Sequence, residues 1–390
     1  MTQPLTPEAA MPESIAPGDP AIDARPALLD LDAEALSAIV AELGAPAYRA
    51  RQIAQAVYKR YALHFDELTE LPLELRRRLA ERLRVGPAET IAEQTSEDGS
   101  TTKLLLRLDD GELIETVLMR YDPFGRRRPR RTVCVSSQAG CGMGCRFCAT
   151  GVQGFRRQLS TGEILLQVLT IARLAREEAS GESAANSTPD FTGPGLTNVV
   201  FMGMGEPLAN YDATHRALQR LSDRDGFGMA PRRITVSTVG LAPGMQRLAT
   251  DHPQVNLAVS LHAADETLRK RLVPVPGASV AAIVQAARAH VAATGRRVSI
   301  EYVLLAGIND DAGQARLLAQ RLRGLNCHVN LIPINASTGV LGARPSRTAV
   351  LAFQAALEKH GISTTVRVEK GRDIAAACGQ LRGDREGTGG

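Results

Sequence analysis

The sequence has no tryptophan, and only 4% of its 390 residues are aromatic. Its six cysteines are too few for the disulfide framework of a small secreted domain. No apolar run approaches the roughly 18 residues that a membrane-spanning helix needs. Neither sign of charge dominates, because 46 Lys and Arg residues stand against 42 Asp and Glu residues, a net charge of +4. These shortages exclude membrane, disulfide-rich and fibrous classes and leave a globular chain of two or three domains.

The N-terminal third is predicted to hold a tail and a helical domain. Residues 1–27 are rich in Pro, Ala and Asp without periodicity, which predicts disorder, and they lack the apolar segment of a secretory signal. Residues 28–95 are predicted to be a helical accessory domain that binds RNA. From Leu28 to Val85 the pattern is helical, with apolar side chains three and four positions apart, as in Tyr48–Tyr61 and Leu71–Leu83. The cations between them are Arg49, Arg51, Lys59, Arg60, Arg76, Arg77 and Arg78. This basic face is either a solvated helix surface or an RNA-binding surface.

Residues 96–131 are predicted to form a β-hairpin and an arginine-rich linker. The strands Thr101–Leu108 and Leu113–Met119 flank Asp109–Gly111, and an Asp-Gly pair favours a tight primed turn. The linker Arg126–Arg131 has five arginines and a proline, which prevents a helix. Its arginines are as compatible with contacts to phosphates as with an exposed connection.

Residues 132–383 alternate short apolar runs with helical stretches, which predicts a parallel α/β sheet. The predicted strands are Thr132–Ser137, Asn198–Met204, Arg233–Thr238, Val255–Leu261, Val298–Leu305, His328–Ile334 and Thr364–Val368. The predicted helices include Thr161–Glu178, Val280–Thr294, Ala312–Gly324 and Arg347–His360. We expect the Gly/Ser/Pro-rich stretch Ser180–Gly195 to be a flexible loop and residues 384–390 to be a flexible tail.

Unusual polar residues gather where the predicted strands end. They are Cys141, Cys145 and Cys148, then Gly205-Glu206-Pro207, Ser237-Thr238, Ser260 and His262, Asn335, and finally Cys378. In a parallel barrel the carboxyl ends of all strands open on one mouth, where loops from distant segments build one site. About six core strands, fewer than the eight of a closed barrel, predict a partial, TIM-like barrel with a lateral opening for a large substrate.

Cys141, Cys145 and Cys148 have the spacing CxxxCxxC. Three thiolates this close can hold a [4Fe–4S] cluster, whose fourth iron is then free to bind a small molecule. A structural zinc site usually takes four ligands from CxxC pairs, and no second pair completes one here. The sequence therefore favours an iron–sulfur site, with zinc or plain reduced thiols as the alternatives.

The cysteine motif, with Phe147 before its last cysteine, resembles the signature of radical S-adenosylmethionine (SAM) enzymes. Further segments, in the same order from about residue 45 to 383, resemble the bacterial adenine-C2 RNA methyltransferases. They are Cys134–Cys141 (CVSSQAGC), Gly203–Pro207 (GMGEP), Ser260–His262 (SLH), Val329–Pro333 (VNLIP) and Ala377–Leu381 (ACGQL). The resemblance implies a radical SAM barrel that methylates C2 of adenine 2503 in 23S rRNA and, in many members, of adenine 37 in some tRNAs.

The same resemblance implies the cofactors and their ligands. One [4Fe–4S] cluster would be held by Cys141, Cys145 and Cys148, and two SAM molecules would be used per turnover. Gly205 and Glu206 would hold the amino end of SAM, since a carboxylate pairs well with an ammonium group. The rest of the SAM site would consist of Ser237, Ser260, Leu261, His262 and Asn335.

Two further cysteines and one glutamate complete the implied chemistry. Cys378 would take a methyl group from one SAM, and a 5′-deoxyadenosyl radical from a second SAM would activate that methyl group for addition to C2, whose hydrogen is not acidic. Cys134 would then attack the Cys378 sulfur, release the RNA and form a transient disulfide. Glu115 would accept a proton, although the arginine-rich linker lengthens the usual spacing between Glu115 and Cys134. Cys327 is expected to be a structural thiol near the start of a strand.

The implied partners are 23S rRNA, tRNA, a flavodoxin- or ferredoxin-type electron donor and a thiol reductant, for a monomeric cytoplasmic enzyme. Because a target adenine must be unstacked and aromatic residues are few, we expect phosphate and shape contacts with RNA. Three alternatives remain. They are C8 methylation by the sister family that confers antibiotic resistance, an iron–sulfur redox or binding protein without enzyme activity, and a zinc-stabilised RNA-binding module.

Overall fold

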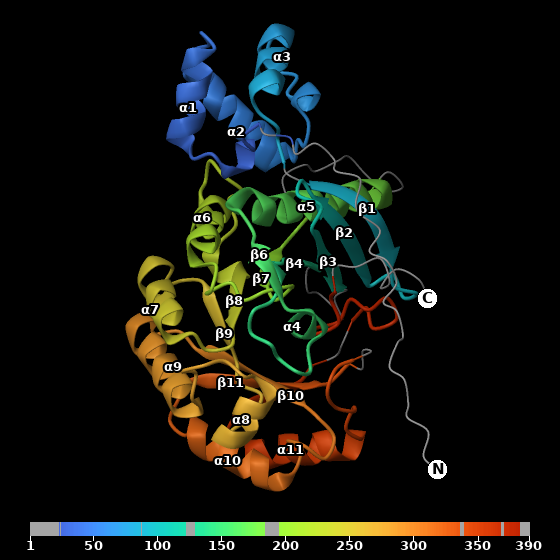
Figure 1. Cartoon of the computed structure of the whole chain (residues 1–390), viewed down its shortest axis with the longest axis vertical. Helices are drawn as coiled ribbons and strands as arrows, with labels where there is room; N and C mark the ends of the chain where they lie inside the picture. Colours follow the sequence, from blue (N-terminus) through green and yellow to red (C-terminus); the bar gives the residue numbers. More distant parts are fainter. Residues whose placement is uncertain are drawn as a thin grey trace, which may run out of the picture.

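The structure, a computed structural model, describes residues 23, 25–86, 88–121, 129–183, 195–335, 339–367 and 370–382. Most of the predicted N-terminal tail, residues 126–128 of the arginine-rich linker and the predicted C-terminal tail lie outside these ranges. Figure 1 shows the N-terminal helices grouped at one end of the molecule, with a long sheet and its covering helices making up the remainder.

The N-terminal helices follow the predicted pattern up to residue 82. They are η1 (Leu28–Asp30), α1 (Ala33–Glu42), α2 (Tyr48–Arg60), η2 (Phe65–Glu67) and α3 (Leu73–Arg82). The Asp32 side chain caps α1 by accepting a hydrogen bond from Ala35 N at 2.7 Å. The apolar stripes of α2 and α3 are buried, with Ile53, Val57 and Leu79 fully inaccessible to solvent.

The helical pattern predicted from Leu28 to Val85 is followed by a strand that the sequence pattern did not predict, β1 (Ala88–Thr95). β1 pairs antiparallel with β2 (Thr101–Leu108), and β2 pairs antiparallel with β3 (Leu113–Tyr121). The segment lacks a helical apolar stripe and gains its backbone hydrogen bonds from the edge of β2, so tertiary pairing decides its conformation.

The predicted hairpin is present, but its turn is not a tight primed one. The strands are joined by residues 109–112, and Leu108 O accepts a hydrogen bond from Gly111 N at 2.9 Å. Gly111 alone in this loop has a positive φ, +85°, whereas a type I′ turn needs positive φ at both central residues. Arg130 and Arg131, expected in the linker, begin β4 (Arg130–Cys134), which pairs antiparallel with β3.

The predicted parallel sheet is confirmed. After β4 it contains β7 (Asn198–Phe201), β8 (Ile234–Thr238), β9 (Asn256–Ser260), β10 (Val298–Leu304), β11 (Cys327–Pro333) and β12 (Thr364–Val366). Each of these strands is parallel to its neighbour, and β1 and β12 form the edges of one ten-stranded sheet. The described sheet is therefore not closed, as a partial barrel requires. Its parallel part has seven strands, one for each of the seven predicted apolar runs, and the last of them, β12, is only three residues long.

The helices lie outside the sheet (Figure 1). They are α5 (Thr161–Ser183), α6 (Tyr211–Ser222), η3 (Pro231–Arg233), α7 (Ala242–Asp251), α8 (Glu266–Leu272), α9 (Val280–Thr294), α10 (Ala312–Leu322) and α11 (Arg347–Lys359). The loop predicted at Ser180–Gly195 begins later than expected, since α5 continues to Ser183, and residues 184–194 are not described. In the described part of the chain, none of the helices combines the length and apolar character that crossing a membrane requires.

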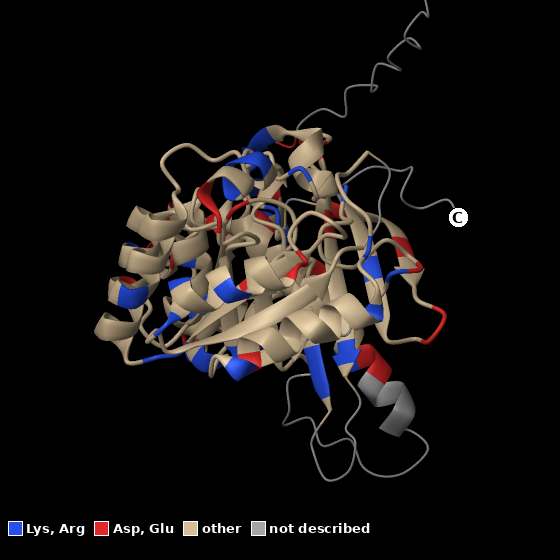
Figure 2. Cartoon of the chain, turned by 90° about the horizontal axis from the view of Figure 1, so that it is seen from below, with Lys and Arg blue, Asp and Glu red and all other residues tan. Residues whose placement is uncertain are grey.

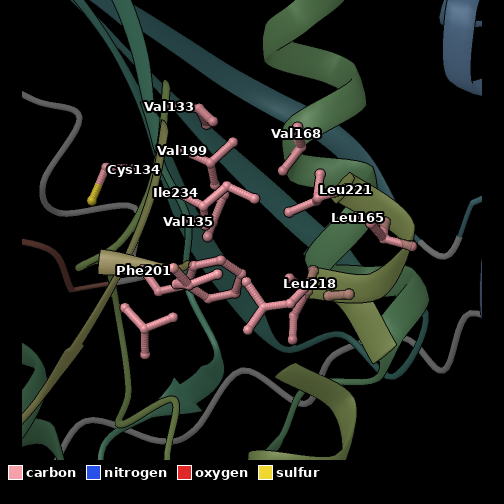
Figure 3. Close-up of a cluster of buried hydrophobic side chains, with 14 of the residues drawn as sticks. Val133, Cys134, Val135, Leu165, Val168, Val199, Phe201, Leu218, Leu221 and Ile234 are labelled. Carbon is pink, nitrogen blue, oxygen red and sulfur yellow. The ribbon is translucent and has the colours of Figure 1, made fainter. Parts of the chain in front are cut away.

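The alternation of side chains along β4 separates the core from the barrel interior. Val133 and Val135 point toward α5 and α6, where they join an apolar cluster that includes Leu165 and Leu218 (Figure 3). Cys134, between the two valines, points to the opposite side of the strand. The period of two in a strand thus sends the thiol into the interior while its neighbours bind the helical layer.

Removing a side chain from this cluster should destabilise the whole sheet–helix layer. Leu218 is fully buried, so Leu218→Ala is expected to lower the free energy of unfolding by about 2–5 kcal/mol. Leu351 on α11 is 50% exposed, and Leu351→Ala serves as the control, with an expected change below about 0.5 kcal/mol. Urea unfolding of both variants, followed by circular dichroism, measures the difference; equal losses would contradict this packing.

Candidate functional site

Polar residues from separate strand ends meet in one cavity at the carboxyl end of the parallel strands. Every predicted position except Leu261 and Glu115 falls on this cavity or on the cleft beside it. The cavity is lined by Cys141, Cys145, Cys148, Gly205, Glu206, Ser237, Ser260, His262, Asn335 and Cys378. The convergence of distant segments predicted from the sequence is therefore present, and we refer to this space as the cofactor cavity.

The three-cysteine loop runs from β5 (Gln138–Gly140) to the short helix α4 (Ala149–Gln153), and β5 pairs with β6 (Phe155–Gln158). Cys141 N donates to Gly154 O at 2.7 Å, which closes the loop. Gly140 has φ of +71°, and a Cβ there would lie 2.1 Å from Gly154 O, so this close approach needs glycine.

Without a bound metal the three thiols are protonated and therefore poor nucleophiles, but they are suitable metal ligands. Burial raises the pKa of Cys141 to about 12 and raises the pKa of Cys145 strongly as well. The thiols stay protonated on their own at neutral pH, whereas a bound metal ion displaces the protons.

The three thiols form a donor set that suits the implied cluster. All three line the cofactor cavity and come from one short loop. Cysteine sulfur is the ligand that iron–sulfur clusters take from proteins, so these residues fit a [4Fe–4S] cluster.

Glu206 is a buried carboxylate held by backbone amides. Its two oxygens accept hydrogen bonds from Leu208 N at 3.0 Å and Val239 N at 2.8 Å. Burial raises the pKa of Glu206 to about 7, and these hydrogen bonds oppose the rise. Gly205 has φ of +98°, and a Cβ there would lie 2.6 Å from the Gln138 side chain, so the loop can bring Glu206 into place only with glycine.

The next strand ends add hydroxyl and amide groups. Ser237 Oγ on β8 and Ser260 Oγ on β9 are 3.3 Å apart. Asn335, after β11, accepts a hydrogen bond from Arg344 at 3.2 Å. Together these groups give the cavity wall donors and acceptors suited to a small polar molecule.

His262 is held in a strained conformation as a neutral imidazole. It has φ of +60°, which is uncommon for a residue with a side chain, and its Nδ1 accepts a hydrogen bond from Val303 N at 3.1 Å. Burial lowers the pKa of His262 to about 3. The ring edge meets Phe147 with 4.7 Å between the ring centroids.

Asn309 is a supporting residue that sequence reasoning missed. Its buried amide donates to His262 O at 2.8 Å and to Val303 O at 2.7 Å, while its oxygen accepts from Leu305 N at 2.7 Å. These bonds fix the strained turn that carries His262. Asparagine in a loop after a strand is common in any turn, so the sequence offered no signal for this role.

Cys378 lies in a C-terminal segment that is bound to the helix following the cysteine loop. Ala149 N donates to Gly379 O at 2.8 Å, and Thr150 Oγ1 donates to Leu381 O at 2.6 Å. Cys378 lines both the cofactor cavity and a smaller cleft that also contains Cys134. Burial, and then the neighbouring Cys378, raise the pKa of Cys134 to about 12, while Arg367 opposes the rise. Cys134 and Cys378 are not joined by a disulfide in this structure.

Glu115, on β3, is buried. Its Oε1 lies 2.8 Å from Nζ of the equally buried Lys103, and its Oε2 accepts from Arg382 N at 2.6 Å. Glu115 does not line the cofactor cavity; it holds the chain directly after the Cys378 segment. Leu261 does not line the cavity either, since its side chain belongs to the main core.

The predicted basic face of the N-terminal domain is partly structural. Arg49 donates to Glu70 O at 2.9 Å, Arg60 pairs with the Glu70 carboxylate, and Arg78 donates to Leu43 O at 2.9 Å. In the view of Figure 2, basic and acidic segments are interspersed without one large face of a single sign. Cys327, at the start of β11, is buried and lines neither the cofactor cavity nor the cleft, as expected of a structural thiol.

The chain was compared with known families, curated proteins and solved structures. The radical SAM superfamily matches residues 135–317, and the ribosomal RNA large subunit methyltransferase N-terminal domain matches residues 27–85. The ribosomal RNA large subunit methyltransferase N of Nitrosopumilus maritimus (strain SCM1) is 45% identical over 90% of this chain and 97% of its own length. The probable dual-specificity RNA methyltransferase RlmN of Mycobacterium sp. (strain KMS) is 47% identical over 90% and 93%. The crystal structure of a radical SAM methyltransferase from Sphaerobacter thermophilus matches with a TM-score of 0.83 and 46% identity, over 92% of this chain and 100% of that one.

The raised pKa of Glu206 should make the stability of the metal-free protein depend on pH. The folded state holds the Glu206 proton more tightly than the unfolded state does, so stability is lost as the pH rises from about 4.5 to about 7. Relative to Glu206→Gln, the wild type should lose roughly 3 kcal/mol across this window, at about 1.36 kcal/mol per pKa unit. Urea unfolding at a series of pH values gives the difference curve, and a flat curve would contradict the assignment.

Proposed function

The chain belongs to the RlmN family of radical SAM RNA methyltransferases, and on this premise we propose that it methylates C2 of adenine 2503 in 23S rRNA and of adenine 37 in some tRNAs. The observation that carries the proposal is that Cys134 and Cys378 line one cleft, which opens on the three-cysteine cavity. An iron–sulfur electron carrier needs no such second pair of thiols, and neither it nor a redox-sensing protein accounts for the Gly205-Glu206-Pro207 segment in the same cavity.

We assign the cofactors to the cavity residues as follows. Cys141, Cys145 and Cys148 hold the [4Fe–4S] cluster, and Glu206 holds the ammonium group of SAM. Cluster and SAM, when bound, supply the radical chemistry that an unactivated aromatic carbon requires. The rest of the SAM site is formed by Gly205, Ser237, Ser260, His262, Asn335 and the backbone of Leu261. His262 stays neutral at physiological pH, so it adds no repulsion against the positively charged sulfonium.

Cys378 and Cys134 carry the covalent steps. Cys378 is the methyl carrier, and after the carbon–carbon bond to adenine C2 forms, the Cys134 sulfur attacks the Cys378 sulfur. The carbon–sulfur bond to the RNA then breaks, its electron pair stays with the carbon, and a proton completes the new methyl group. A disulfide between Cys134 and Cys378 remains and is reopened by a thiol reductant. The docking of the Cys378 segment on α4 supports this pairing, since it keeps the two sulfurs in one cleft.

Glu115 is the proposed proton acceptor of the reaction, and it also positions the segment that carries Cys378. Its contacts with Lys103 and with Arg382 N support the second role, because they hold the segment that carries Cys378. The proposed partners are 23S rRNA, tRNA, a flavodoxin- or ferredoxin-type electron donor and a thiol reductant, for a monomeric cytoplasmic enzyme. The match of the N-terminal domain to an rRNA methyltransferase domain supports the RNA substrate.

The proposed activity can be tested on the anaerobically reconstituted protein. We expect about four irons per chain, release of 5′-deoxyadenosine from SAM, and 2-methyladenine in added RNA. Mass spectrometry of digested RNA separates C2 from C8 methylation and rRNA from tRNA as substrate. Absence of SAM cleavage by a fully loaded cluster would rule out the enzyme, and 8-methyladenine alone would favour the sister activity.

The two cysteine roles predict opposite outcomes for two variants. Cys134→Ala should accumulate a covalent protein–RNA adduct, because the thioether can no longer be resolved, whereas Cys378→Ala should form none. Cys327→Ala is the matched control, since Cys327 lies outside the cofactor cavity and the cleft, and it should behave like the wild type. Denaturing gel electrophoresis with labelled RNA detects the adduct; equal amounts in both active-site variants would contradict the assigned roles.

A further inference from the structure

A second cavity lies inside the open barrel, toward the amino ends of the parallel strands. Its volume is about 480 Å³, within the range of small-molecule sites. Six short polar side chains, one from each of six strands, contribute to its wall: Thr132, Asn198, Thr235, Ser299, Asn330 and Thr365. In a closed parallel barrel this part of the interior is filled by bulky branched residues. We call this space the polar chamber.

The chamber is part of the same interior face that carries the site. Thr132 lies two residues before Cys134 on β4, and Thr235 lies two residues before Ser237 on β8. A period of two places both members of each pair on one face of the sheet. The interior face is thus lined by small polar groups at the amino end and by the site residues at the carboxyl end.

The chamber is continuous with the cleft that holds Cys134 and Cys378. Met119, Tyr121, Met202 and Arg367 line both spaces. The cofactor cavity, where SAM and the cluster are assigned, adjoins the cleft at Met202, Arg367 and Cys378. It also adjoins the chamber, since Met202, Glu301 and Arg367 line both. The chamber therefore borders the cleft with the two sulfurs and the assigned cofactor site.

The charge of the chamber suits a polyanion. Arg130 and Arg367 line it, and Glu301 is the one carboxylate among its described lining residues. Glu301 accepts from Asn330 at 2.8 Å and lies 3.9 Å from the Arg367 guanidinium. Cations near an open cavity of this kind favour contacts with phosphate groups.

Two further features point to a polar ligand. The Arg130 guanidinium lies 3.9 Å from the centroid of the Tyr121 ring, and Lys370 Nζ lies 5.1 Å from it, so cations and an aromatic face occur together where chamber and cleft meet. Thr132 is 4% exposed, and its hydroxyl has no hydrogen-bond partner in the described structure. A buried hydroxyl without a partner is costly unless a ligand or water satisfies it.

We propose that the polar chamber binds the nucleotide adjacent to the target adenine of the RNA substrate. The proposal rests on the proposed function, because an adenine held between Cys134 and Cys378 must remain joined to its neighbours through the ribose–phosphate backbone. The phosphate lies against Arg130 and Lys370. The ribose and base edge bond to the chamber hydroxyl and amide groups, which suit the 2′-hydroxyl and base edges of RNA.

The test narrows the chamber and follows RNA binding. Thr235→Leu and Ser299→Leu fill the space with apolar volume, and Thr235→Ser is the matched control that keeps it open and polar. We expect each leucine variant to raise Kd and KM for an RNA stem-loop by about tenfold or more, and Thr235→Ser to stay within about twofold. Methylation of Cys378, which needs no RNA, is measured in every variant by mass spectrometry as the reference for a folded, SAM-binding protein.

Combining the protein variant with an altered RNA, as in a double-mutant cycle, separates a direct contact from a structural effect. The stem-loop is made with an abasic nucleotide directly 5′ or 3′ of the target adenine. If the chamber binds that nucleotide, the abasic change weakens wild-type binding but has little further effect on Thr235→Leu, so the two losses are not additive. Losses that add fully at both positions, or leucine variants with unchanged Kd and KM, would overturn the proposal.

The same measurements distinguish this proposal from the proposed function. A wild-type protein that neither methylates Cys378 nor modifies RNA would refute the function itself. A wild type that does both, together with leucine variants that bind RNA equally well, would refute only the chamber. In that outcome the chamber holds water or admits the thiol reductant to the Cys134–Cys378 disulfide.

Discussion

The site depends on the parallel pairing of β4 with β7 and of each following strand with the next. Parallel strands all end on one side, so the loops that follow them meet even though they are far apart in the sequence. The same pairing fixes which face each residue occupies. Val133 on β4 and Val135 directly after it pack against the helices, and Cys134 between them points into the interior (Figure 3). A shift of one residue in register would bury Cys134 among the helices and expose the valines to the interior.

The position of Cys378 is decided by contacts rather than by a strand. The segment is bound to α4 through Ala149 and Thr150, and to β3 through Glu115. Since α4 begins directly after Cys148, the three-cysteine loop and the Cys378 segment are joined through this short helix. The buried Lys103–Glu115 pair adds rigidity, because either charge left alone in this environment would be strongly unfavourable.

Burial has different consequences for the groups around the cavity. It keeps the thiols protonated until a metal replaces the proton, keeps His262 neutral, and brings the pKa of Glu206 near 7. These protonation states suit a cationic sulfonium ligand, because an ionised Glu206 attracts it and a neutral His262 does not repel it. The open sheet, in contrast, leaves part of the interior unburied. At the amino end of the strands the interior is accessible and polar, whereas in a closed barrel it would be packed with side chains.

The sequence by itself determined the features that neighbouring residues express. The CxxxCxxC spacing, the apolar runs of the parallel strands and the polar residues at their ends are local patterns, and the structure contains all of them. Tertiary structure decided the strand at residues 88–95, the turn at Gly111, the burial of Glu115, the support of His262 by Asn309, and the polar chamber. The hydrogen bond from Arg382 to Glu115 joins positions 267 residues apart. Local periodicity cannot encode such a contact, because it exists only once the sheet has brought the two segments together.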